Sequence, residues 1–406
     1  MKRRGDIEGT VPILTAGCTS LAKTDSSGPA FVQTDEWPAD GYDVARTGVS
    51  PQSDPVSLSS DQRWSVEIGS EIRSTPIVVD GRVYVHDRGA GKTASLDEHT
   101  GEVLWKRFTG GKDPLAAPAL DDERVYLNDS GDRTVLALDA ETGDTEWTFS
   151  TAHGSRSIAS ADGTVFVGSD EGAALIALEA ETGRERWSVD VGSELFGPPA
   201  IVDGTVYAGS TNSRVLALDV DDSTEHWRFD ASGGVVAAPT VRDGTVYVGT
   251  QSGIVHALDR ETGTEQWRSN TDGLGMLYPS PAVDDELLVV GTWNTGEVRA
   301  FDPHSGREQW QVVDLEQVLS VTSPVIAGDR VYFGSDDGLH AVDPTQASTA
   351  RSCRRTRRVE CNRRPRSSMR RSTSAITRAL STPSRKRSNE RRSWSSRLRR
   401  SFAVEA

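Results

Sequence analysis

The residues that could carry out chemistry do not converge on an active-site pattern. Residues 86–93, His-Asp-Arg-Gly-Ala-Gly-Lys-Thr, superficially resemble a loop that cradles phosphate with backbone N–H groups at the start of a helix. His86 replaces the first glycine of that motif, and the segment lies between two expected strands. We therefore interpret it as a hairpin loop.

Metal-binding and nucleophilic patterns are also missing from the sequence. The seven histidines include no pair at metal-ligand spacing, and no His-Glu-x-x-His or Gly-x-Ser-x-Gly motif occurs. Asp-Gly pairs at 80–81, 162–163, 203–204 and 243–244 could suggest calcium, but their regular recurrence is typical of turns. We assign no catalytic, cofactor-binding or metal-binding residue and expect no cofactor.

Tryptophan recurs at a spacing that does not drift. An acidic residue precedes a Trp by eight positions in six successive units: Asp97 and Trp105, Asp139 and Trp147, Glu179 and Trp187, Asp219 and Trp227, Asp259 and Trp267, Asp302 and Trp310. Thr-Gly or Ser-Gly lies between the two in five of the units, with Asp222-Ser223 as the exception. A period of about 40 residues predicts a repeat architecture.

Each repeat predicts four short strands. In the clearest copy, Val241 and then residues 246–248 are short β-branched or aromatic runs, and the turn pair Asp243-Gly244 lies between them. A turn at 252–253 leads to residues 254–258, and Thr262-Gly263 precedes the strand that contains Trp267. Four-stranded units repeated around an axis make an all-β propeller, with Trp packed between neighbouring blades and its indole N–H on a backbone acceptor.

The pattern Ala-x-Asp-x-x-Thr-Gly-x-x-x-Trp resembles the tryptophan-docking motif of pyrroloquinoline-quinone-like (quinoprotein-type) propellers. Residues 37–38, 41–43 and 46–48 resemble the lead-in that precedes such propellers. WD40 propellers have a similar period, but Asp follows Trp there and follows none of these. The resemblance assigns blade docking to seven tryptophans: Trp64, Trp105, Trp147, Trp187, Trp227, Trp267 and Trp310.

The repeat stops part-way through its seventh unit. That unit runs from Ser323 to Asp343, after which Ala347 and Arg351 stand where Gly and Trp are expected. The chain thus encodes six complete blades and a seventh partial one. Eight blades are intended on our interpretation, and Trp64 would supply the last strand of blade eight, hiding the sheet edges. An open ring of this kind is expected to be unstable and prone to aggregate.

The Arg/Ser-rich end, residues 347–406, is interpreted as an out-of-frame translation. In a GC-rich gene, a one-base shift turns residues 365–369 into approximately Ser-Pro-Val-Val-Asp. It turns residues 372–384 into approximately Val-Tyr-Val-Gly-Asp-Tyr-Thr-Gly-Thr-Leu-Tyr-Ala-Leu, which resembles the missing blade. The alternative is a genuine, disordered basic tail that acts on an acidic partner.

Charge divides the chain at the same place. From Arg351 onward there are 19 Lys or Arg and 3 Asp or Glu, a net charge of +16 in a chain whose total is −15, so the first 350 residues carry −31. Such an acidic body disfavours nucleic acid, whose phosphates require clustered basic residues. The acidity and the scarcity of Lys resemble halophilic archaeal proteins, and the alternative is an ordinary acidic protein.

The N-terminus resembles an export signal. Lys2-Arg3-Arg4, an apolar stretch at 11–14, and Thr15-Ala16-Gly17-Cys18 resemble a twin-arginine lipoprotein signal with Cys18 as the lipidated residue, although Asp6 and Glu8 interrupt the pattern. The expected organisation is a signal at 1–18, a linker and pre-propeller segment at 19–56, the propeller at 57–346 and the tail at 347–406. Without a working signal the protein would be cytoplasmic.

Two functions remain open. The first is a non-enzymatic scaffold at the cell surface, membrane-associated only through a lipid anchor and binding an unknown protein or extracellular ligand. The second, implied by the resemblance, is a dehydrogenase that oxidises alcohols or sugars with pyrroloquinoline quinone and calcium. The adjacent cysteines of its alcohol-oxidising branch do not occur among Cys18, Cys353 and Cys361.

The frame interpretation predicts a specific nucleotide sequence. Sequencing codons 343 to 365 of the gene and the region after them should reveal an alternative frame that encodes the remaining strands and a docking Trp. Absence of a blade from both other frames would rule out the interpretation and leave the basic tail.

Overall fold

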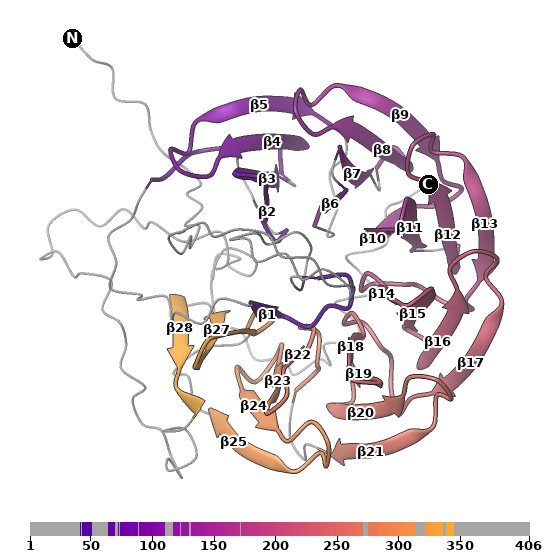
Figure 1. Ribbon diagram of the computed structural model, residues 1–406, viewed down its shortest axis with the longest axis vertical. Helices are drawn as coiled ribbons and strands as arrows, with labels where there is room; N and C mark the ends of the chain where they lie inside the picture. The colour runs from indigo at the N-terminus through magenta and orange to yellow at the C-terminus, as the bar shows by residue number, and fades with distance from the viewer. Residues whose placement is uncertain are drawn as a thin grey trace, which may run out of the picture.

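The computed structural model describes residues 41, 43–50, 64–69, 72, 74–87, 89–109, 117–121, 123–129, 131–170, 172–270, 275–312, 321–335 and 338–344. These residues form twenty-eight strands in seven sheets arranged around one axis. Figure 1 shows the sheets as the blades of an incomplete ring, with the break between the last blade and the first. Cys18 and residues 345–406 lie outside the described residues. The predicted all-β propeller is confirmed.

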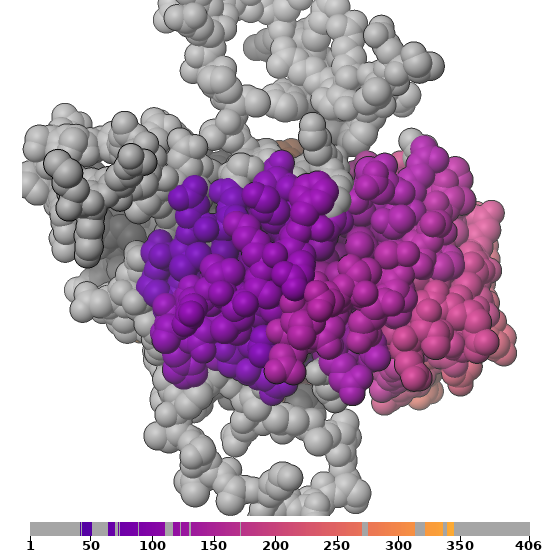
Figure 2. Space-filling model, turned by 90° about the horizontal axis from the view of Figure 1, so that it is seen from above, coloured from indigo at the N-terminus to yellow at the C-terminus, as the bar shows by residue number. Residues whose placement is uncertain are grey.

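Six blades, named A to F, are complete antiparallel sheets whose strands follow chain order from the axis outward. Blade A contains β2 (Ile77–Val79), β3 (Arg82–Asp87), β4 (Lys92–Asp97) and β5 (Val103–Phe108). Blade B contains β6 (Ala119–Leu120), β7 (Arg124–Asp129), β8 (Thr134–Asp139) and β9 (Thr145–Ser150). Blade C contains β10 (Ser155–Ala161), β11 (Thr164–Ser169), β12 (Ala174–Glu179) and β13 (Glu185–Asp190). Their outer strands line the rim of the disc, which Figure 2 shows edge-on.

Blades D to F repeat the same order. Blade D contains β14 (Ala200–Val202), β15 (Thr205–Ser210), β16 (Arg214–Asp219) and β17 (Glu225–Asp230). Blade E contains β18 (Thr240–Arg242), β19 (Thr245–Gly249), β20 (Ile254–Asp259) and β21 (Glu265–Asn270). Blade F contains β22 (Ala282–Val283), β23 (Leu288–Gly291), β24 (Val298–Phe301) and β25 (Glu308–Val312). The middle strands are buried almost throughout, because neighbouring blades cover both of their faces.

Blade G is incomplete in the described residues. It has β26 (Val325–Ala327), β27 (Arg330–Ser335) and β28 (Gly338–Val342), and the order of its sheet is β1-β26-β27-β28. Strand β1 (Val49–Ser50) comes from the N-terminal side and pairs in parallel with β26 at the inner edge. The expected six complete blades and partial seventh are therefore present.

The expected hairpins are present. Asp80 and Gly81, like the pairs at 162–163, 203–204 and 243–244, adopt positive φ at both positions between strands one and two of their blades. This is the conformation of a type I′ turn, which Asp-Gly favours and which matches the twist of a hairpin. The segment 86–93 connects β3 to β4, with Asp87 opposite Lys92, so its interpretation as a hairpin loop is confirmed.

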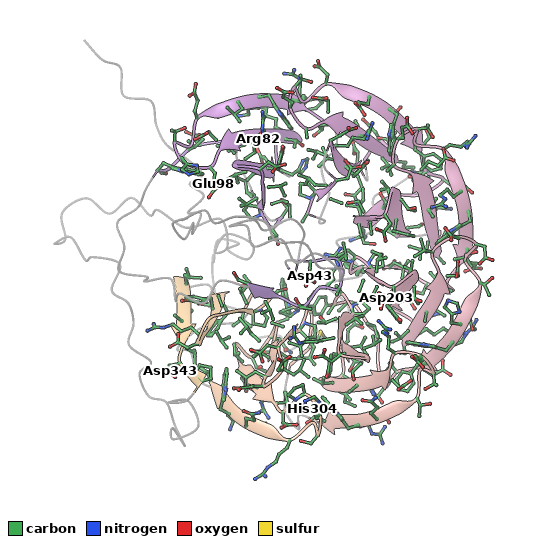
Figure 3. The ribbon with its side chains drawn as sticks, viewed as in Figure 1. Asp43, Arg82, Glu98, Asp203, His304 and Asp343 are labelled. Atoms are coloured by element: carbon green, nitrogen blue, oxygen red, sulfur yellow. The ribbon has the colours of Figure 1, made fainter. Side chains whose placement is uncertain are left out.

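A segment of the expected pre-propeller region lies inside the ring. Residues 43–50, here called the strap, cross the inner edges of four blades, and Asp43 lies near the axis in Figure 3. Backbone carbonyls of the strap accept one N–H from each innermost strand at 2.8–2.9 Å: Val44 from Ile201, Ala45 from Val241, Thr47 from Val283 and Gly48 from Ile326. The strap thereby satisfies donors that would otherwise face the axis unpaired.

The sequence of the strap explains its shape. Asp43 accepts hydrogen bonds from the Thr47 N–H at 2.8 Å and from the Thr47 hydroxyl at 2.6 Å, closing a turn in which Arg46 adopts a φ of 62°. The buried Arg46 side chain donates to the Pro199 carbonyl at 3.1 Å. Gly48, at a φ of +65°, has no room for a side chain, since a Cβ would lie 2.9 Å from that of Ala282.

No helix in the described part of the chain has the length and apolarity needed to cross a membrane.

Candidate functional site

The seven predicted docking tryptophans lie between blades or beside blade A. Six of them donate the indole N–H to the carbonyl of the residue that follows the repeat's acidic position in the next unit, at 2.7–2.9 Å: Trp64 to Glu98, Trp105 to Ala140, Trp147 to Ala180, Trp187 to Val220, Trp227 to Arg260 and Trp267 to Pro303. Trp64 makes this contact with blade A. It occupies the position that the docking Trp of a blade before blade A would have.

Glycine of the Thr-Gly turn makes room for each ring. A Cβ on Gly101, Gly143, Gly183, Gly263 or Gly306 would lie 2.4–2.6 Å from an indole carbon of the preceding Trp. These glycines also have positive φ, which a residue with a side chain adopts at a cost of about 1–2 kcal/mol. Ser223 accepts that conformation at the one exceptional interface, with a φ of 62°.

A tyrosine of the second strand shares the indole's acceptor at four interfaces. The hydroxyls of Tyr84, Tyr126, Tyr207 and Tyr247 lie 3.1–3.5 Å from the same carbonyls that accept from the Trp of their own blade. The Tyr126 hydroxyl also donates to the Asp121 carboxylate. The Tyr and Trp rings lie 5.8–6.1 Å apart. Burial raises the pKa of these four phenols above the ordinary value for tyrosine, so the hydroxyls remain protonated at neutral pH and can donate hydrogen bonds.

The acidic position of the repeat holds the turn together. Asp97, Asp259 and Asp302 each accept hydrogen bonds from the N–H and the hydroxyl of the Thr or Ser three residues later, and the hydroxyl bond is the main reason that the pKa of each carboxyl is lowered. A lowered pKa in the folded state stabilises the protein above about pH 4, and that stabilisation is lost as pH falls further.

Trp310 differs from the other six. Its indole nitrogen is buried and has no hydrogen-bond partner among the described residues. Its acceptor, by analogy, would be the carbonyl of Pro344, which follows Asp343 at the edge of the described blade G. Glu98 and Asp343 stand on opposite sides of the break in the ring (Figure 3). The docking interaction is therefore complete at six interfaces and incomplete at the seventh.

Two buried histidines make their polar contacts inside or beside their own blades. His86 is buried, its Nδ1 lies 2.9 Å from the Thr93 hydroxyl, and burial lowers its pKa to about 4. His256 is buried between Glu265, 2.6 Å from its Nδ1, and the Ser232 N–H, and burial is the main cause of its lowered pKa. No group of three His, Cys, Asp or Glu side chains in the described ranges is placed to hold a metal ion.

A small cavity lies between the strap and the neighbouring blades. It has a volume of about 90 Å³ and is lined by Asp43, Arg46, Leu120, Ser160 and Ile201, among others. Burial raises the pKa of the Asp43 carboxyl, although hydrogen bonds from Thr47 and the charge of Arg46 oppose the shift. A space of this size accommodates a few water molecules.

An aromatic cluster on a loop face was missed by the sequence analysis. Trp293, in the loop between β23 and β24, is 38% exposed, and Met276, in the connection from blade E to blade F, is 37% exposed. The rings of Trp293 and Tyr278 lie 5.5 Å apart. The signal that could have found it is that Trp293 is a tryptophan outside the eight-residue spacing.

The cluster is held in place by hydrogen bonds. The Trp293 N–H donates to the Met276 carbonyl at 2.9 Å, and the Met276 N–H donates to the Asn294 side chain at 2.9 Å. Gln251, from the loop between β19 and β20, donates to the Tyr278 hydroxyl at 3.1 Å. Three loops of two blades therefore fix one exposed aromatic surface, which we call the loop-face cluster: Met276, Tyr278 and Trp293.

The repeats match one family model. The model described as outer membrane protein assembly factor BamB matches residues 57–133, 111–158, 131–273 and 224–365. The chain belongs to this family of propellers with pyrroloquinoline-quinone-like repeats. The family match spans the whole described ring apart from the strap. No curated protein sequence is similar enough to this chain to count as a match.

Solved structures with the same fold include BamB and two dehydrogenases. BamB from Moraxella catarrhalis is 23% identical with a TM-score of 0.59, covering 69% of this chain and 84% of that chain. Quinohemoprotein alcohol dehydrogenase from Comamonas testosteroni is 16% identical with a TM-score of 0.65, covering 76% and 71%. A europium-containing methanol dehydrogenase is 14% identical with a TM-score of 0.65, covering 77% and 84%. At these identities the likeness concerns the fold.

The docking geometry predicts that Gly263→Ala is more destabilising than Gly244→Ala. Both glycines have positive φ, +69° and +77°, but a Cβ on Gly263 meets Trp227 at 2.6 Å whereas nothing lies within 4 Å of one on Gly244. The Gly244 variant therefore measures backbone strain alone. Displacement of the indole should add about 1–3 kcal/mol to the loss of unfolding free energy, measured by urea denaturation. Equal losses would mean that the Trp–Gly contact contributes nothing.

Proposed function

We propose that this protein is a non-enzymatic scaffold that binds another protein through the loop-face cluster. The observation that carries the proposal is an exposed aromatic surface whose shape is fixed before any partner arrives. Trp and Tyr dominate the binding energy of protein interfaces, because they bury a large area while losing few rotatable bonds. Membership of a family described by an outer-membrane assembly factor supports a role in protein binding.

The geometry of the loop-face cluster suits a central contact. Tyr278 is half-buried and held by Gln251, so that Trp293 and Met276 present their apolar surface over a rigid support. Methionine adapts its shape to a partner more readily than other apolar residues. The acidic body of the chain favours a partner with Lys or Arg around an apolar centre, because complementary charge speeds association.

The proposal predicts that Trp293→Ala weakens partner binding. Immobilised protein is used to capture envelope proteins of the native host, and the retained proteins are quantified. Loss of a central aromatic contact costs about 2 kcal/mol or more, so retention of a specific partner should fall about 30-fold in apparent affinity. Phe108→Ala is the matched control, because Phe108 is 76% exposed on the outer strand of blade A, away from the cluster.

Two results would contradict the scaffold. The first is capture that is equally insensitive to both substitutions. The second is turnover of alcohols or sugars when the protein is supplied with pyrroloquinoline quinone, calcium and an artificial electron acceptor. That activity would instead support the quinone-dependent dehydrogenase, the alternative that the solved dehydrogenases of the same fold keep open.

We further propose that the scaffold is exported and anchored at the cell surface through a lipid on Cys18. The support is the basic-then-apolar sequence that ends at this cysteine. Expression of the wild type and Cys18→Ser in the host should place the wild type in the membrane fraction and release the variant. Metabolic labelling with a lipid precursor should mark only the wild type. Identical fractionation and labelling of both would exclude the anchor, and the protein would be cytoplasmic or otherwise retained.

A further inference from the structure

Strand β28 ends blade G one strand early. In the six complete blades the third strand pairs on its outer side with a fourth strand, whereas β28 is the outermost strand of its sheet among the described residues. Where the repeat would place the fourth strand's Trp, the chain has Arg351. The edge of blade G is therefore the place where the pattern of the ring is broken.

A small residue on β28 lies under the position that a Trp would occupy. In each complete blade a small third-strand residue faces the docking Trp across the sheet and is completely buried: Ser95, Ala137, Ala177, Ala217, Ala257 and Ala300. Ala341 is their counterpart in β28 and is only half-buried. The position on β28 that would lie opposite an indole is thus less completely buried than its counterparts in the complete blades.

The indole N–H of Trp310, in blade F, is a second sign that blade G is incomplete. Six docking indoles have a backbone acceptor, and the buried nitrogen of Trp310 has none in the ranges that the structure describes. A buried donor without an acceptor costs about 1–3 kcal/mol. In the complete units the acceptor carbonyl lies at the turn between strands three and four of the next blade. The corresponding carbonyl in blade G is that of Pro344. A fourth strand paired with β28 would order the chain at Pro344 and so help to bring its carbonyl to the Trp310 indole.

We propose that β28 accepts an extended strand from a partner protein, with a tryptophan of that strand opposite Ala341. The added strand would run antiparallel to β28, and its backbone hydrogen bonds would provide affinity while the indole provides specificity. This site is independent of the loop-face cluster.

Strand β21 defines the chemistry of the partner strand. Its neighbour β20 resembles β28, since His256-Ala257-Leu258-Asp259 in β20 corresponds to His340-Ala341-Val342 in β28 and the Asp343 that follows it. In that pair Trp267 lies opposite Ala257 and Glu265 opposite Leu258. Transferred to blade G, the register places Trp opposite Ala341 and Glu opposite Val342. The partner strand thus carries Glu-x-Trp in an extended segment.

The test uses the full chain and a fluorescently labelled peptide with the sequence of residues 262–270, Thr-Gly-Thr-Glu-Gln-Trp-Arg-Ser-Asn. Fluorescence anisotropy should detect saturable binding. Replacement of the peptide's Trp by Ala should weaken binding at least tenfold. Ala341→Leu in the protein should do the same, because the larger side chain fills the space for the indole, whereas Trp293→Ala should leave peptide binding unchanged.

Hydrogen exchange provides a second measurement. The bound peptide should slow amide exchange in residues 338–342 and leave exchange in blades B to E unchanged. Unchanged exchange in those blades of the Ala341→Leu variant verifies that it is folded. Failure of the peptide to bind would overturn the proposal, as would binding without protection of β28. Self-association that Ala341→Leu abolishes and the peptide cannot displace would assign the site to a second copy instead.

Discussion

The contact between one blade's indole and the next blade's turn is the interaction on which the ring depends. Each four-stranded sheet is a separate hydrogen-bonded unit, so in the described part of the chain the blades are joined through side chains, connecting loops and the strap. A docking Trp contributes a large apolar face against glycine and one N–H to a carbonyl of the next blade. Five of these indoles lie on a glycine that leaves just enough space for the ring. The repeat spacing is conserved along the chain because this geometry repeats.

Blade docking also explains why the ring is not uniform. The interface after blade C has Phe166 in place of the tyrosine and Ser223 in place of the glycine, yet Trp187 still reaches its carbonyl. The interface after blade F differs more, because the Trp310 indole has no acceptor within the described part of the chain. Replacement of both the tyrosine and the glycine is therefore tolerated at the interface after blade C, whereas the buried donor at the interface after blade F is unsatisfied among the described residues. This difference distinguishes a variable interface from a broken one.

The strap connects blades through their inner edges. Docking contacts join neighbouring blades in pairs, but the strap joins four of them through one continuous backbone from Val44 to Gly48. Because the innermost strands are two or three residues long, the hydrogen bonds that they make to the strap are a sizeable share of their total. The Asp43–Thr47 turn and the Arg46–Pro199 contact hold the strap in position. The lead-in motif thus has a structural role within the propeller.

The sequence by itself determined the blade, its period, its turns and the docking positions, because these depend on contacts between residues at fixed separations. Asp243-Gly244, for example, specifies its hairpin locally, and Asp259 with Thr262 specifies its turn. Tertiary structure alone decided where the strap lies and that Met276, Tyr278 and Trp293 meet. Strap residues contact strands more than 150 residues away, and the cluster is assembled from two blades. No local pattern encodes such distances, since closure of the blades around the axis is what brings these residues together.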